Sequence, residues 1–561
     1  MVVVAYFGRD ELRGLFTVFL FHTKPLDLLL DGETIYPHHA VDRRLSKSNP
    51  NSVDDFLECL PKHFHKPSKP ISDAIYTPSN TSFQFVYELH TSNLRALSQA
   101  NATRKPVAII AALHESHVQE TVVCAQKSGL QVRIRSGGHD YEGLSFVSFS
   151  SVPFVIIDLS NIRSINIDMK TETAWVQAGA TTGELYYRIA EKSKVHGFPA
   201  GVCTTLGIGG HFTGGGYGNL MRKFGLSIDN VVDAQLIDVK ARIHNRKSMG
   251  EDVFWAIRGG GGTSFGVILS WKIKLVPVPA KVTVFQVQRT LEEGATDLAH
   301  KWLQVAYKLD KDLFTRITSV AIPATGNTNS TVRVIFIVHF LGKTDRLLKL
   351  LHASLPELGL QRKDCLEMSW IESTLFWFGF PNGTSIDVLL NRVPTGKVFS
   401  KSKSDYIKNV FPKEGLTTLW RMMMEIGSSW MQMNPYGGRM AEISESETAF
   451  AHRAGTLYKF QYTAFWSEGS SEATEKYLGL MTKLYAEMAP YVSSKPREAF
   501  LNYRDLDIGS NGTDFEVAKV YGAKYFKRNF QRLAEVKAKV DPHNFFNNEQ
   551  SIPPFPSSKS K

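Results

Sequence analysis

The spacing of hydrophobic and polar residues changes near residue 280, and this change predicts two structural regions. From residue 106 to 272, short apolar runs alternate with helical patterns, which predicts helices at 117–128 and 183–194 and strands at 107–110, 131–135, 154–159, 173–178, 231–239 and 266–272. Beyond Pro277 and Pro279, the alternation extends over longer stretches, at 282–288, 316–322, 331–341 and 457–466. Such alternation is typical of an antiparallel sheet. We therefore expect an α+β protein with a domain boundary near residue 280.

Two helices carry sequence signals for where they begin and end. Helix 117–128 is predicted to have Ser116 as its N-cap and Gly129 as the residue after its last turn, with an apolar stripe along one face. A second helix, 525–540, is predicted to end before Asp541-Pro542, because proline cannot continue a helix. Its apolar stripe consists of Phe526, Phe530, Leu533, Val536 and Val540.

The same patterns predict how the chain is divided. Residues 1–52 show no sustained period and are expected to be a leader or a misassigned gene start. We expect a first domain at 53–280, a second domain with a large antiparallel sheet backed by helices at 281–496, a segment at 497–553 that returns to the first domain, and a flexible tail at 554–561. No uninterrupted run of about 20 apolar residues occurs, so no transmembrane segment is predicted.

The composition bears on the class of protein and on its partners. Hydrophobic residues make up 43% of the 561 residues and charged residues 21%, which is ordinary for a globular protein. The net charge of +11 would suit nucleic acid or an acidic cell-wall matrix as a neighbour. The basic residues are dispersed and form no nucleic-acid-binding signature, so we expect no nucleic acid as a partner.

Four cysteines and five glycosylation sequons indicate in which cellular compartment the protein is expected to be located. The spacing of Cys59, Cys124, Cys203 and Cys365 matches neither a metal-binding knuckle nor a redox dithiol, so no metal site is expected. The sequons lie in polar, loop-like stretches, at Asn80, Asn101, Asn329, Asn382 and Asn511. They favour a secreted protein, located in the cell wall or apoplast or in another secretory compartment.

Three glycine-rich segments are candidates for binding an anionic or flat ligand. Residues 135–141, Arg-Ser-Gly-Gly-His-Asp-Tyr, follow a predicted strand, and their two glycines would let backbone N–H groups approach a diphosphate. Residues 201–218 contain eight glycines in 18 residues, which predicts repeated close approach of the backbone to a ligand. A third cluster, at 258–263, precedes the strand predicted at 266–272.

These segments resemble the plant berberine bridge enzyme-like family, within the vanillyl-alcohol-oxidase-type FAD-binding superfamily. The resemblance extends from Val53 to about Pro553 and rests on five motifs in order: 135–143, the Cys203 segment, Arg-Gly-Gly-Gly-Gly at 258–262, Asn-Tyr-Arg-Asp-Leu-Asp at 502–507, and Asn-Phe-Phe at 544–546. It implies a two-subdomain FAD-binding domain of the PCMH/VAO type, together with a substrate domain.

The resemblance implies a flavin attached through two side chains. His139 would bond to the 8α-methyl group and Cys203 to C6, and the two tethers would fix the ring and raise its reduction potential. The residues expected to bind FAD around these attachments are Arg135, Ser136, Gly137, Gly138, Asp140, Leu206, Gly207, Gly209, Gly210, Gly214, Gly215, Gly216, Gly218, Gly261 and Asn502.

The resemblance also implies a disulfide between Cys59 and Cys124. This bond requires an oxidising compartment, which supports secretion. Cys365 is then expected to be a buried free thiol.

Segment 457–466 resembles the family's active-site strand. Its alternation places Lys459, Gln461 and Thr463 on one face and an aromatic core on the other, formed by Tyr458, Phe460, Tyr462, Ala464 and Trp466. The berberine bridge enzyme itself has a glutamate base at the position of Gln461. This difference argues against alkaloid ring closure.

Lys459 and Gln461, with Tyr141, Tyr217 and Tyr503, instead resemble the branch that oxidises monolignols and their glucosides. A lysine ammonium stabilises a phenolate by charge and across the ring face, so Lys459 could convert a tyrosine into a base. Tyr217 is the first choice for that base. The counterpart of Tyr503 is a base in the similar cannabinoid synthases, so both alternatives stay open.

We therefore expect a monomeric FAD-linked oxidoreductase that takes a hydride from the CH–OH carbon of an alcohol such as coniferyl alcohol or its glucoside. Leu206 is larger than the valine typical of fast oxidases in the family, which predicts poor use of oxygen and an unidentified electron acceptor. One alternative is a carbohydrate oxidase acting on the anomeric carbon of oligosaccharides. Another is a secreted flavin-binding cell-wall protein whose catalysis is incidental.

Overall fold

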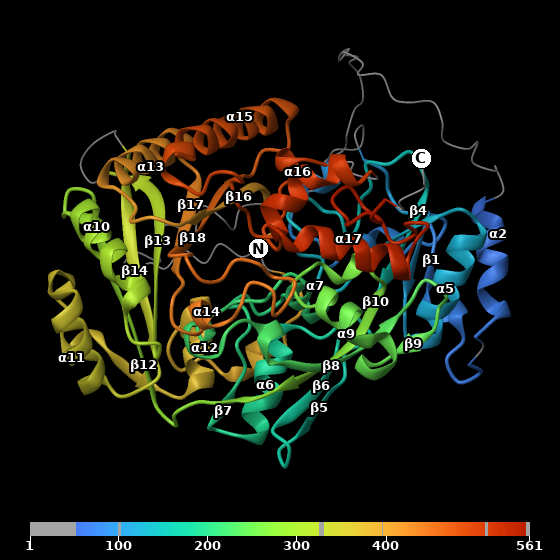
Figure 1. Ribbon diagram of the computed structural model, residues 1–561, viewed down its shortest axis with the longest axis horizontal. Helices are drawn as coiled ribbons and strands as arrows, with labels where there is room; N and C mark the ends of the chain where they lie inside the picture. The colour runs from blue at the N-terminus through green and yellow to red at the C-terminus, as the bar shows by residue number, and fades with distance from the viewer. Residues whose placement is uncertain are drawn as a thin grey trace.

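The computed structural model describes residues 52–64, 66–98, 103–324, 330–394, 396–510 and 514–556 (Figure 1). The expected leader, apart from Ser52, lies outside these residues, as do residues 557–561 of the expected tail. In the described part of the chain, the strands form sheets of four, five, two and seven strands. Helices cover these separate sheets, which confirms the expected α+β class.

A four-stranded sheet lies in the N-terminal part, in the order β1 (Ile75–Tyr76), β2 (Ala108–Ala111), β4 (Phe154–Asp158) and β3 (Gln131–Arg135). β4 runs parallel to both β2 and β3. Parallel strands need a crossover connection, and α5 (Glu115–Lys127) provides the one between β2 and β3. β2 and β4 are buried along their whole length, as expected for parallel strands.

Helix α5 begins earlier than its sequence signals predicted. The N-cap is His114 and not Ser116, because Nδ1 of His114 accepts a hydrogen bond from the backbone N–H of Ser116 at 3.1 Å. Histidine is not among the usual capping residues, so the sequence favoured the serine. The end of the helix was predicted correctly, since Gly129 has a positive φ of 67° directly after Ser128.

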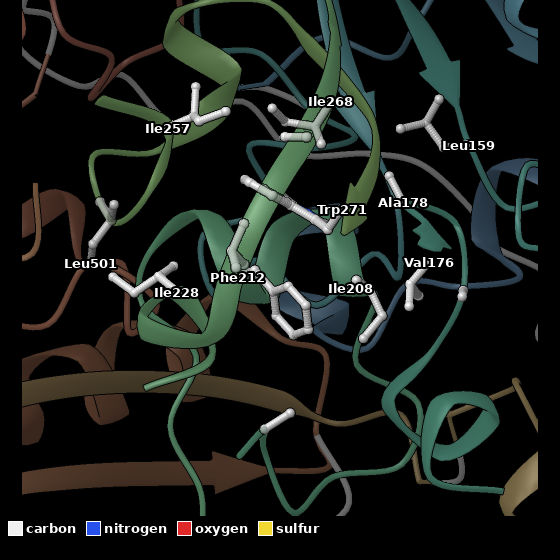
Figure 2. Packing of buried hydrophobic residues seen from close by; sticks show 14 of the residues in the cluster. Leu159, Val176, Ala178, Ile208, Phe212, Ile228, Ile257, Ile268, Trp271 and Leu501 are labelled. Carbon is white, nitrogen blue, oxygen red and sulfur yellow. The ribbon is translucent and has the colours of Figure 1, made fainter. Parts of the chain in front are cut away.

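An antiparallel five-stranded sheet follows, in the order β5 (Ile165–Asp168), β6 (Thr173–Gln177), β10 (Val267–Lys274), β8 (Val231–Ile237) and β9 (Ile243–His244). Helices α6 (Thr182–Lys192), α7 (Ile208–Thr213), α8 (Met221–Phe224) and α9 (Arg246–Ile257) belong to this part. Figure 2 shows Trp271 of β10 in the core beside Phe212 of α7, and both side chains are fully buried. This packing anchors α7, and with it the glycine-rich segment, against the sheet.

The seven-stranded antiparallel sheet has the order β15 (Leu366–Met368), β12 (Val282–Thr290), β14 (Ser330–Phe340), β13 (Leu313–Pro323), β17 (Ser429–Pro435), β18 (Tyr458–Trp466) and β16 (Phe399–Ile407). One face packs against α10 (Ala295–Val305), α11 (Thr344–Ser354), α13 (Lys413–Ile426) and α15 (Ser471–Met488) (Figure 1). Val284, Phe314 and Tyr406 of the other face join the core of the N-terminal part. That face is therefore turned toward the glycine-rich segments.

The C-terminal segment contains two helices where the sequence predicted one at 525–540. α16 (Phe515–Phe526) and α17 (Asn529–Val540) are separated at Lys527, which has a positive φ of 53°. The predicted single helix was therefore wrong at its start. Lys537 of α17 donates a hydrogen bond to the carbonyl of Ser264 at 2.7 Å, so the segment packs against the N-terminal part.

The strands change sheet where the domain boundary was predicted. β7 (His196–Gly197) pairs with β11 (Val276–Pro277), and β12 then begins the seven-stranded sheet at Val282. The predicted domain limits themselves stay predictions. None of the helices in the described ranges combines the length and the apolar character needed to cross a membrane.

Candidate active site

A cavity lies where the turn after β3, the start of α7 and the C-terminal segment meet. Its wall brings together eleven of the residues predicted to bind FAD: Ser136, Gly137, Gly138, His139, Asp140, Leu206, Gly207, Gly209, Gly210, Gly261 and Asn502. Of the other predicted residues, the wall does not include Arg135, Cys203, Gly214, Gly215, Gly216 or Gly218. The wall also includes three residues that the sequence analysis did not predict: Arg133, Arg504 and Asn547. Arg133 and Asn547 lie outside the glycine-rich motifs, and Arg504 lies in a motif that was interpreted for its neighbour Tyr503.

The charges in the cavity wall are compatible with a diphosphate. Asp140 is the one carboxylate among the described lining residues, and its Oδ2 lies 2.9 Å from Nε of Arg504. Arg133 is paired with the buried Glu549 at 2.9 Å. No uncompensated negative charge therefore opposes an anion here. Backbone N–H groups of glycine-rich turns are the usual cradle for such a group, so the residues present fit FAD.

The glycines allow close contact mainly between protein segments. A Cβ at Gly218 would lie 1.8 Å from the carbonyl oxygen of Ala200, and one at Gly137 would lie 2.3 Å from the backbone N of Gly207. A Cβ at Gly210, in contrast, would meet no atom within 4 Å. The sequence predicted that the backbone approaches a ligand throughout the segment. At Gly137 and Gly218 the glycine also faces another part of the chain, and the approach to a ligand stays a prediction.

Arg135 lies behind the cavity and not in its wall. Its guanidinium is fully buried, and its Nε lies 2.7 Å from Oδ2 of Asp158. Two further donors reach the backbone carbonyls of Tyr87 and Val86 at 2.7 and 2.8 Å. These contacts tie β3 to β4 and to α3 (Phe83–Glu88), so the side chain supports the turn that carries His139.

The two predicted attachment residues converge on Thr205. Nε2 of His139 lies 3.0 Å from Oγ1 of Thr205, and Sγ of Cys203 lies 3.6 Å from the same oxygen. Burial lowers the pKa of His139 well below its usual value, which leaves the imidazole neutral, with a lone pair on one ring nitrogen. Thr205 was missed from the sequence, although it lies two residues after Cys203.

A second cluster, beside the seven-stranded sheet, brings together all five predicted catalytic residues: Lys459 and Gln461 from β18, and Tyr141, Tyr217 and Tyr503 from loops. Nζ of Lys459 lies 3.0 Å from the centroid of the Tyr217 ring and 4.7 Å from that of Tyr503. The hydroxyl groups of Tyr217 and Tyr503 are hydrogen-bonded to each other. Tyr141 stacks on Tyr503 with centroids 5.5 Å apart, and its hydroxyl accepts a hydrogen bond from Nε2 of Gln461 at 2.8 Å.

The strand periodicity predicted for β18 is correct, and both of its faces are buried. Tyr458, Phe460 and Tyr462 pack in the core beneath the helices, whereas Lys459 and Gln461 project from the opposite face. Lys459 is 0% exposed and Gln461 1% exposed, so neither belongs to a solvated strand face. A cation in this position is costly unless a negative charge or an aromatic face compensates it.

Burial shifts the pKa values of Lys459, Tyr503 and Tyr141 away from the charged forms. The pKa of Lys459 is lowered well below its usual value by burial and then by the nearby Arg316. The pKa of Tyr503 is raised well above its usual value by burial and then by Tyr217. Burial likewise raises the pKa of Tyr141. Each charge is unfavourable alone, but an ammonium and a phenolate formed together would stabilise each other.

Two further residues enclose the lysine and were missed from the sequence. Nζ of Lys459 lies 3.8 Å from the centroid of the Phe500 ring. Cζ of Arg316 lies 5.9 Å from the centroid of Tyr217, and its Nε donates to Oδ1 of Asn434 at 2.6 Å. Arg316 begins a stretch that was read only as an alternating strand. The signal that could have identified Arg316 is its positive charge within an otherwise alternating strand pattern.

The predictions for the cysteines and for the glycosylation sequons can be compared with the structure. Cys59 and Cys124 form the expected disulfide, with Cα atoms 5.7 Å apart. Cys365 is free as expected but only half-buried, so its predicted burial was wrong, because it lies directly before the exposed first residues of β15. Asn80 and Asn382 are exposed. The sequons at 101, 329 and 511 lie outside the described residues.

Comparison with known protein families matches two separate parts of the chain. Residues 106–246 match the family described as FAD binding domain, and residues 499–553 match the family described as berberine and berberine like. The first segment contains the turn with His139 and the glycine-rich run with Cys203. The second contains Tyr503 and also Glu549, which pairs with Arg133 of the first segment.

Known relatives cover nearly the whole chain. Berberine bridge enzyme-like 17 of Arabidopsis thaliana is 54% identical over 514 residues, which are 91% of this chain and 96% of the relative. The solved structure of BBE-like 28 of the same plant is 44% identical, with a TM-score of 0.83, and the match covers 90% of this chain and all of that one. Phl p 4, a grass pollen allergen with glucose dehydrogenase activity, is 41% identical with a TM-score of 0.83 and the same coverage.

Proposed function

The chain belongs to the berberine bridge enzyme-like family of FAD-binding oxidoreductases, and on this basis we propose that it oxidises the hydroxymethyl carbon of a monolignol or its glucoside to an aldehyde. The observation that carries the proposal is Lys459, whose Nζ lies 3.0 Å from the centroid of the Tyr217 ring in a buried cluster. Gln461 occupies the neighbouring position on that strand face, so the strand offers no carboxylate base there. A tyrosine assisted by a lysine is the base that this cluster can supply.

The residues of the cluster divide the reaction between them. A phenolate oxygen of the tyrosine pair accepts the proton of the substrate hydroxyl, while Lys459 stabilises the phenolate by charge. Gln461 holds the hydroxyl of Tyr141 at 2.8 Å and so fixes a second polar group beside the reacting carbon. FAD bound in the cavity would supply the acceptor for the hydride that leaves this carbon.

Tyr217 is the better candidate for the base. Nζ of Lys459 lies 3.0 Å from the centroid of its ring but 4.7 Å from that of Tyr503. Because Coulomb energy falls with distance, the phenolate of the nearer ring gains more from the ammonium. The hydroxyl of Tyr503 is in hydrogen-bond contact with that of Tyr217 and would donate to the phenolate once it forms.

We assign His139 and Cys203 as the residues that would hold FAD covalently. Both lie within reach of one hydroxyl, that of Thr205, at 3.0 and 3.6 Å, so a single ring edge could meet both. Burial keeps the imidazole neutral, which is the form able to make a bond to carbon. Two attachments would hold the ring in one orientation against the tyrosine cluster.

The size of the Leu206 side chain favours an electron acceptor other than oxygen. It lines the cavity and occupies the position at which fast oxidases of the family carry valine. An isoleucine-to-valine variant of Phl p 4 is described as a glucose oxidase, while the unsubstituted protein is described as a glucose dehydrogenase. The volume of one branched side chain therefore governs oxygen use in that relative, and the larger Leu206 favours a dehydrogenase here.

A second candidate is oxidation of a sugar at its anomeric carbon. The glucose dehydrogenase activity of Phl p 4 favours it. A flavin-binding cell-wall protein with incidental catalysis is the third candidate, and the complete tyrosine and lysine cluster argues against it. The disulfide and the exposed Asn80 and Asn382 support secretion for any of these functions.

Turnover by the FAD-loaded protein with a dye as acceptor distinguishes the candidates. We expect coniferyl alcohol or its 4-O-glucoside to be oxidised to the aldehyde, with cellobiose and oligogalacturonides turned over at least about 100-fold less efficiently in kcat/KM. Oxidation of cellobiose without oxidation of either alcohol would replace the proposal by the second candidate. No turnover of any of them by a yellow, folded protein would favour the third.

A further inference from the structure

The loops that carry Tyr141 and Tyr503 are linked to each other through successive residues. Oδ2 of Asp140 lies 2.9 Å from Nε of Arg504. At the next position, the ring of Tyr141 stacks on that of Tyr503, with centroids 5.5 Å apart and ring planes within 3° of parallel. The residues that follow, beginning with Glu142, are carboxylates that cannot pair directly with each other. They are linked through a lysine from a different part of the chain.

Lys401 of β16 provides this link. Its Nζ lies 2.7 Å from Oε1 of Glu142 and 2.8 Å from Oδ1 of Asp505. A third carboxylate oxygen, Oδ1 of Asp507, lies 3.0 Å away. An ammonium group has three N–H donors, so one donor is available for each of these three residues. β16 is the edge strand of the seven-stranded sheet, and Lys401 therefore ties both loops to that sheet.

The three groups of this bridge are buried and charged. Lys401 is 2% exposed, Glu142 3% and Asp505 2%. Burial alone would raise the pKa of Glu142, but Arg95 and Lys401 lower it below its usual value. Burial alone would lower the pKa of Lys401, but Glu142 and Asp505 raise it above its usual value. Because desolvation offsets much of the attraction in a buried ion pair, the bridge is better suited to fixing geometry than to adding net stability.

Each of the two carboxylates also has a second cation, which contacts only one of the loops. Nη2 of Arg95 lies 2.7 Å from Oε2 of Glu142. Nζ of Lys403 lies 3.0 Å from Oδ2 of Asp505. Without the ammonium of Lys401, both carboxylates would therefore stay paired, but the direct bridge between the loops would be lost. The bridge can thus be removed without leaving a buried carboxylate unpaired.

The arrangement of these loops determines where the hydroxyl groups of the tyrosines lie. The hydroxyl of Tyr503 is hydrogen-bonded to that of Tyr217. The hydroxyl of Tyr141 accepts a hydrogen bond from Gln461 at 2.8 Å. A displacement of about 1 Å in a catalytic group can slow a reaction on the order of 100-fold. A shift of either loop would therefore disturb both contacts and the reaction that depends on them.

We propose that Lys401 is a positioning residue for the oxidation: its bridge between Glu142 and Asp505 holds the stacked tyrosines in the arrangement that proton transfer requires. The inference rests on the proposed function and adds to it a residue that is not part of the wall of the FAD cavity. Because the lysine acts through the tyrosines, its loss should slow the chemical step and leave substrate binding nearly unchanged. A purely structural role would lower stability without this specific effect on the chemical step.

The test measures reduction of the bound flavin by coniferyl alcohol in a single turnover, in the FAD-loaded wild type and in Lys401→Met. We expect the rate constant of reduction to fall roughly 10- to 100-fold, while the alcohol concentration that gives half of the maximal rate changes less than about threefold. Glu142→Gln weakens the same bridge from its other end. The double variant should therefore lose less than about threefold beyond Lys401→Met, whereas multiplied losses would contradict a shared bridge.

Lys408→Met is the matched control. Lys408 directly follows β16, and its Nζ lies 3.0 Å from Oε2 of Glu498, which would keep Nδ1 of His452 as a partner at 2.8 Å. This substitution therefore removes a lysine from an ion pair next to the same strand but breaks no bridge between the tyrosine loops. We expect its rate constant of flavin reduction to stay within about threefold of the wild type, even if Tm falls as far as in Lys401→Met.

Crystal structures of the FAD-loaded wild type and variants give a second measurement, which does not depend on turnover. In Lys401→Met we expect the rings of Tyr141 and Tyr503 to move apart or to tilt from their stacked arrangement. Lys408→Met should keep the arrangement of the wild type. Glu142→Gln should show a displacement in the same direction as Lys401→Met, and it provides this measurement if Lys401→Met fails to fold.

The outcomes separate the positioning role from the function on which it rests. An undisturbed tyrosine stack in Lys401→Met, or equal losses of rate in Lys401→Met and Lys408→Met, would overturn the positioning role and leave alcohol oxidation standing. Oxidation of cellobiose but of neither alcohol would overturn the proposed function. The positioning role would then still be supported if the stack moves and if reduction of the flavin by cellobiose slows in Lys401→Met but not in Lys408→Met.

Discussion

Lys459 lies over the ring of Tyr217, and its Nζ, 3.0 Å from the ring centroid, has no hydrogen-bond partner among the described residues. The lysine comes from the seven-stranded sheet and the tyrosine from the glycine-rich segment, so the contact forms only when the two parts pack together. Burial lowers the pKa of Lys459, and a nearby phenolate would restore its proton. The charge of the lysine is thereby coupled to ionisation of the tyrosine.

Replacing Lys459 with Met should lower kcat for alcohol oxidation by roughly 100- to 10,000-fold. A phenolate without the ammonium has a higher pKa, so the rise of activity with pH should also move to higher pH. Steady-state kinetics across pH measure both effects. Lys483→Met is the control, because Lys483 lies on the surface of α15, paired with Glu425 at 2.6 Å. An unchanged kcat and pH profile in Lys459→Met would exclude the lysine from the reaction.

The two tyrosines should differ when each loses its hydroxyl group. Tyr217→Phe should reduce kcat by roughly 100-fold or more, as expected for loss of a base, whereas Tyr503→Phe should reduce it by roughly tenfold, as expected for loss of one hydrogen bond. Single-turnover reduction of the flavin, followed by absorbance, isolates this step. The opposite order of losses would assign the base to Tyr503.

FAD should stay attached to the denatured protein through either of two side chains. His139→Ala and Cys203→Ala should each retain one covalent bond, and only the double variant should release FAD on acid precipitation. The mass of the denatured protein checks this prediction directly. Cys365→Ala is the matched control, since Cys365 is a free cysteine directly before β15 and does not line the FAD cavity. A wild-type protein at its apo mass would refute covalent attachment.

Leu206→Val should raise the rate at which oxygen reoxidises the reduced flavin, because the smaller side chain opens space in the cavity wall. We expect an increase of roughly tenfold or more, while reduction of the flavin by substrate changes little. Stopped-flow mixing of reduced protein with oxygen measures the first rate, and anaerobic mixing with substrate measures the second. Equal rates of flavin reoxidation by oxygen in the wild type and the variant would show that Leu206 does not limit the access of oxygen.

The stability of the protein should depend on pH through Glu498. Its buried carboxylate lies 2.8 Å from Nδ1 of His452 and 3.0 Å from Nζ of Lys408. Burial alone would raise its pKa, but these partners lower the pKa to about 2. A carboxylate with a lowered pKa stabilises the fold above the usual value near 4.5, and the stabilisation is lost as the pH falls toward 2.

Glu498→Gln should therefore lower Tm at neutral pH, by an amount corresponding to on the order of 3 kcal/mol for a shift of this size. The difference in Tm between the variant and the wild type should shrink as the pH falls below about 4.5. Thermal unfolding at a series of pH values measures it. Glu487→Gln, on the exposed surface of α15, should change Tm little at any pH. A constant difference across pH would contradict the linkage.

Periodicity alone located most of the fold. The alternation in 457–466 corresponds to β18 (Tyr458–Trp466), and the stretch at 282–288 begins β12 at the same residue, Val282. Such patterns are reliable because burial of one face repeats every second residue along a strand. The starts of α5 and α17 were less predictable, because a histidine cap and a single left-handed lysine leave little trace in the apolar pattern.

The sequence by itself determined the flavin-binding class, because ordered motifs place His139, Cys203 and the glycine runs in one recognisable series. Only the tertiary structure decided which side chains meet. Packing places Thr205 within reach of both His139 and Cys203 and places Arg316 beside Tyr217. Strand register places Gln432 opposite Gln461. Apart from the contact between Cys203 and Thr205, these contacts join residues far apart in the chain. Local periodicity contains no information about which strand lies next to which.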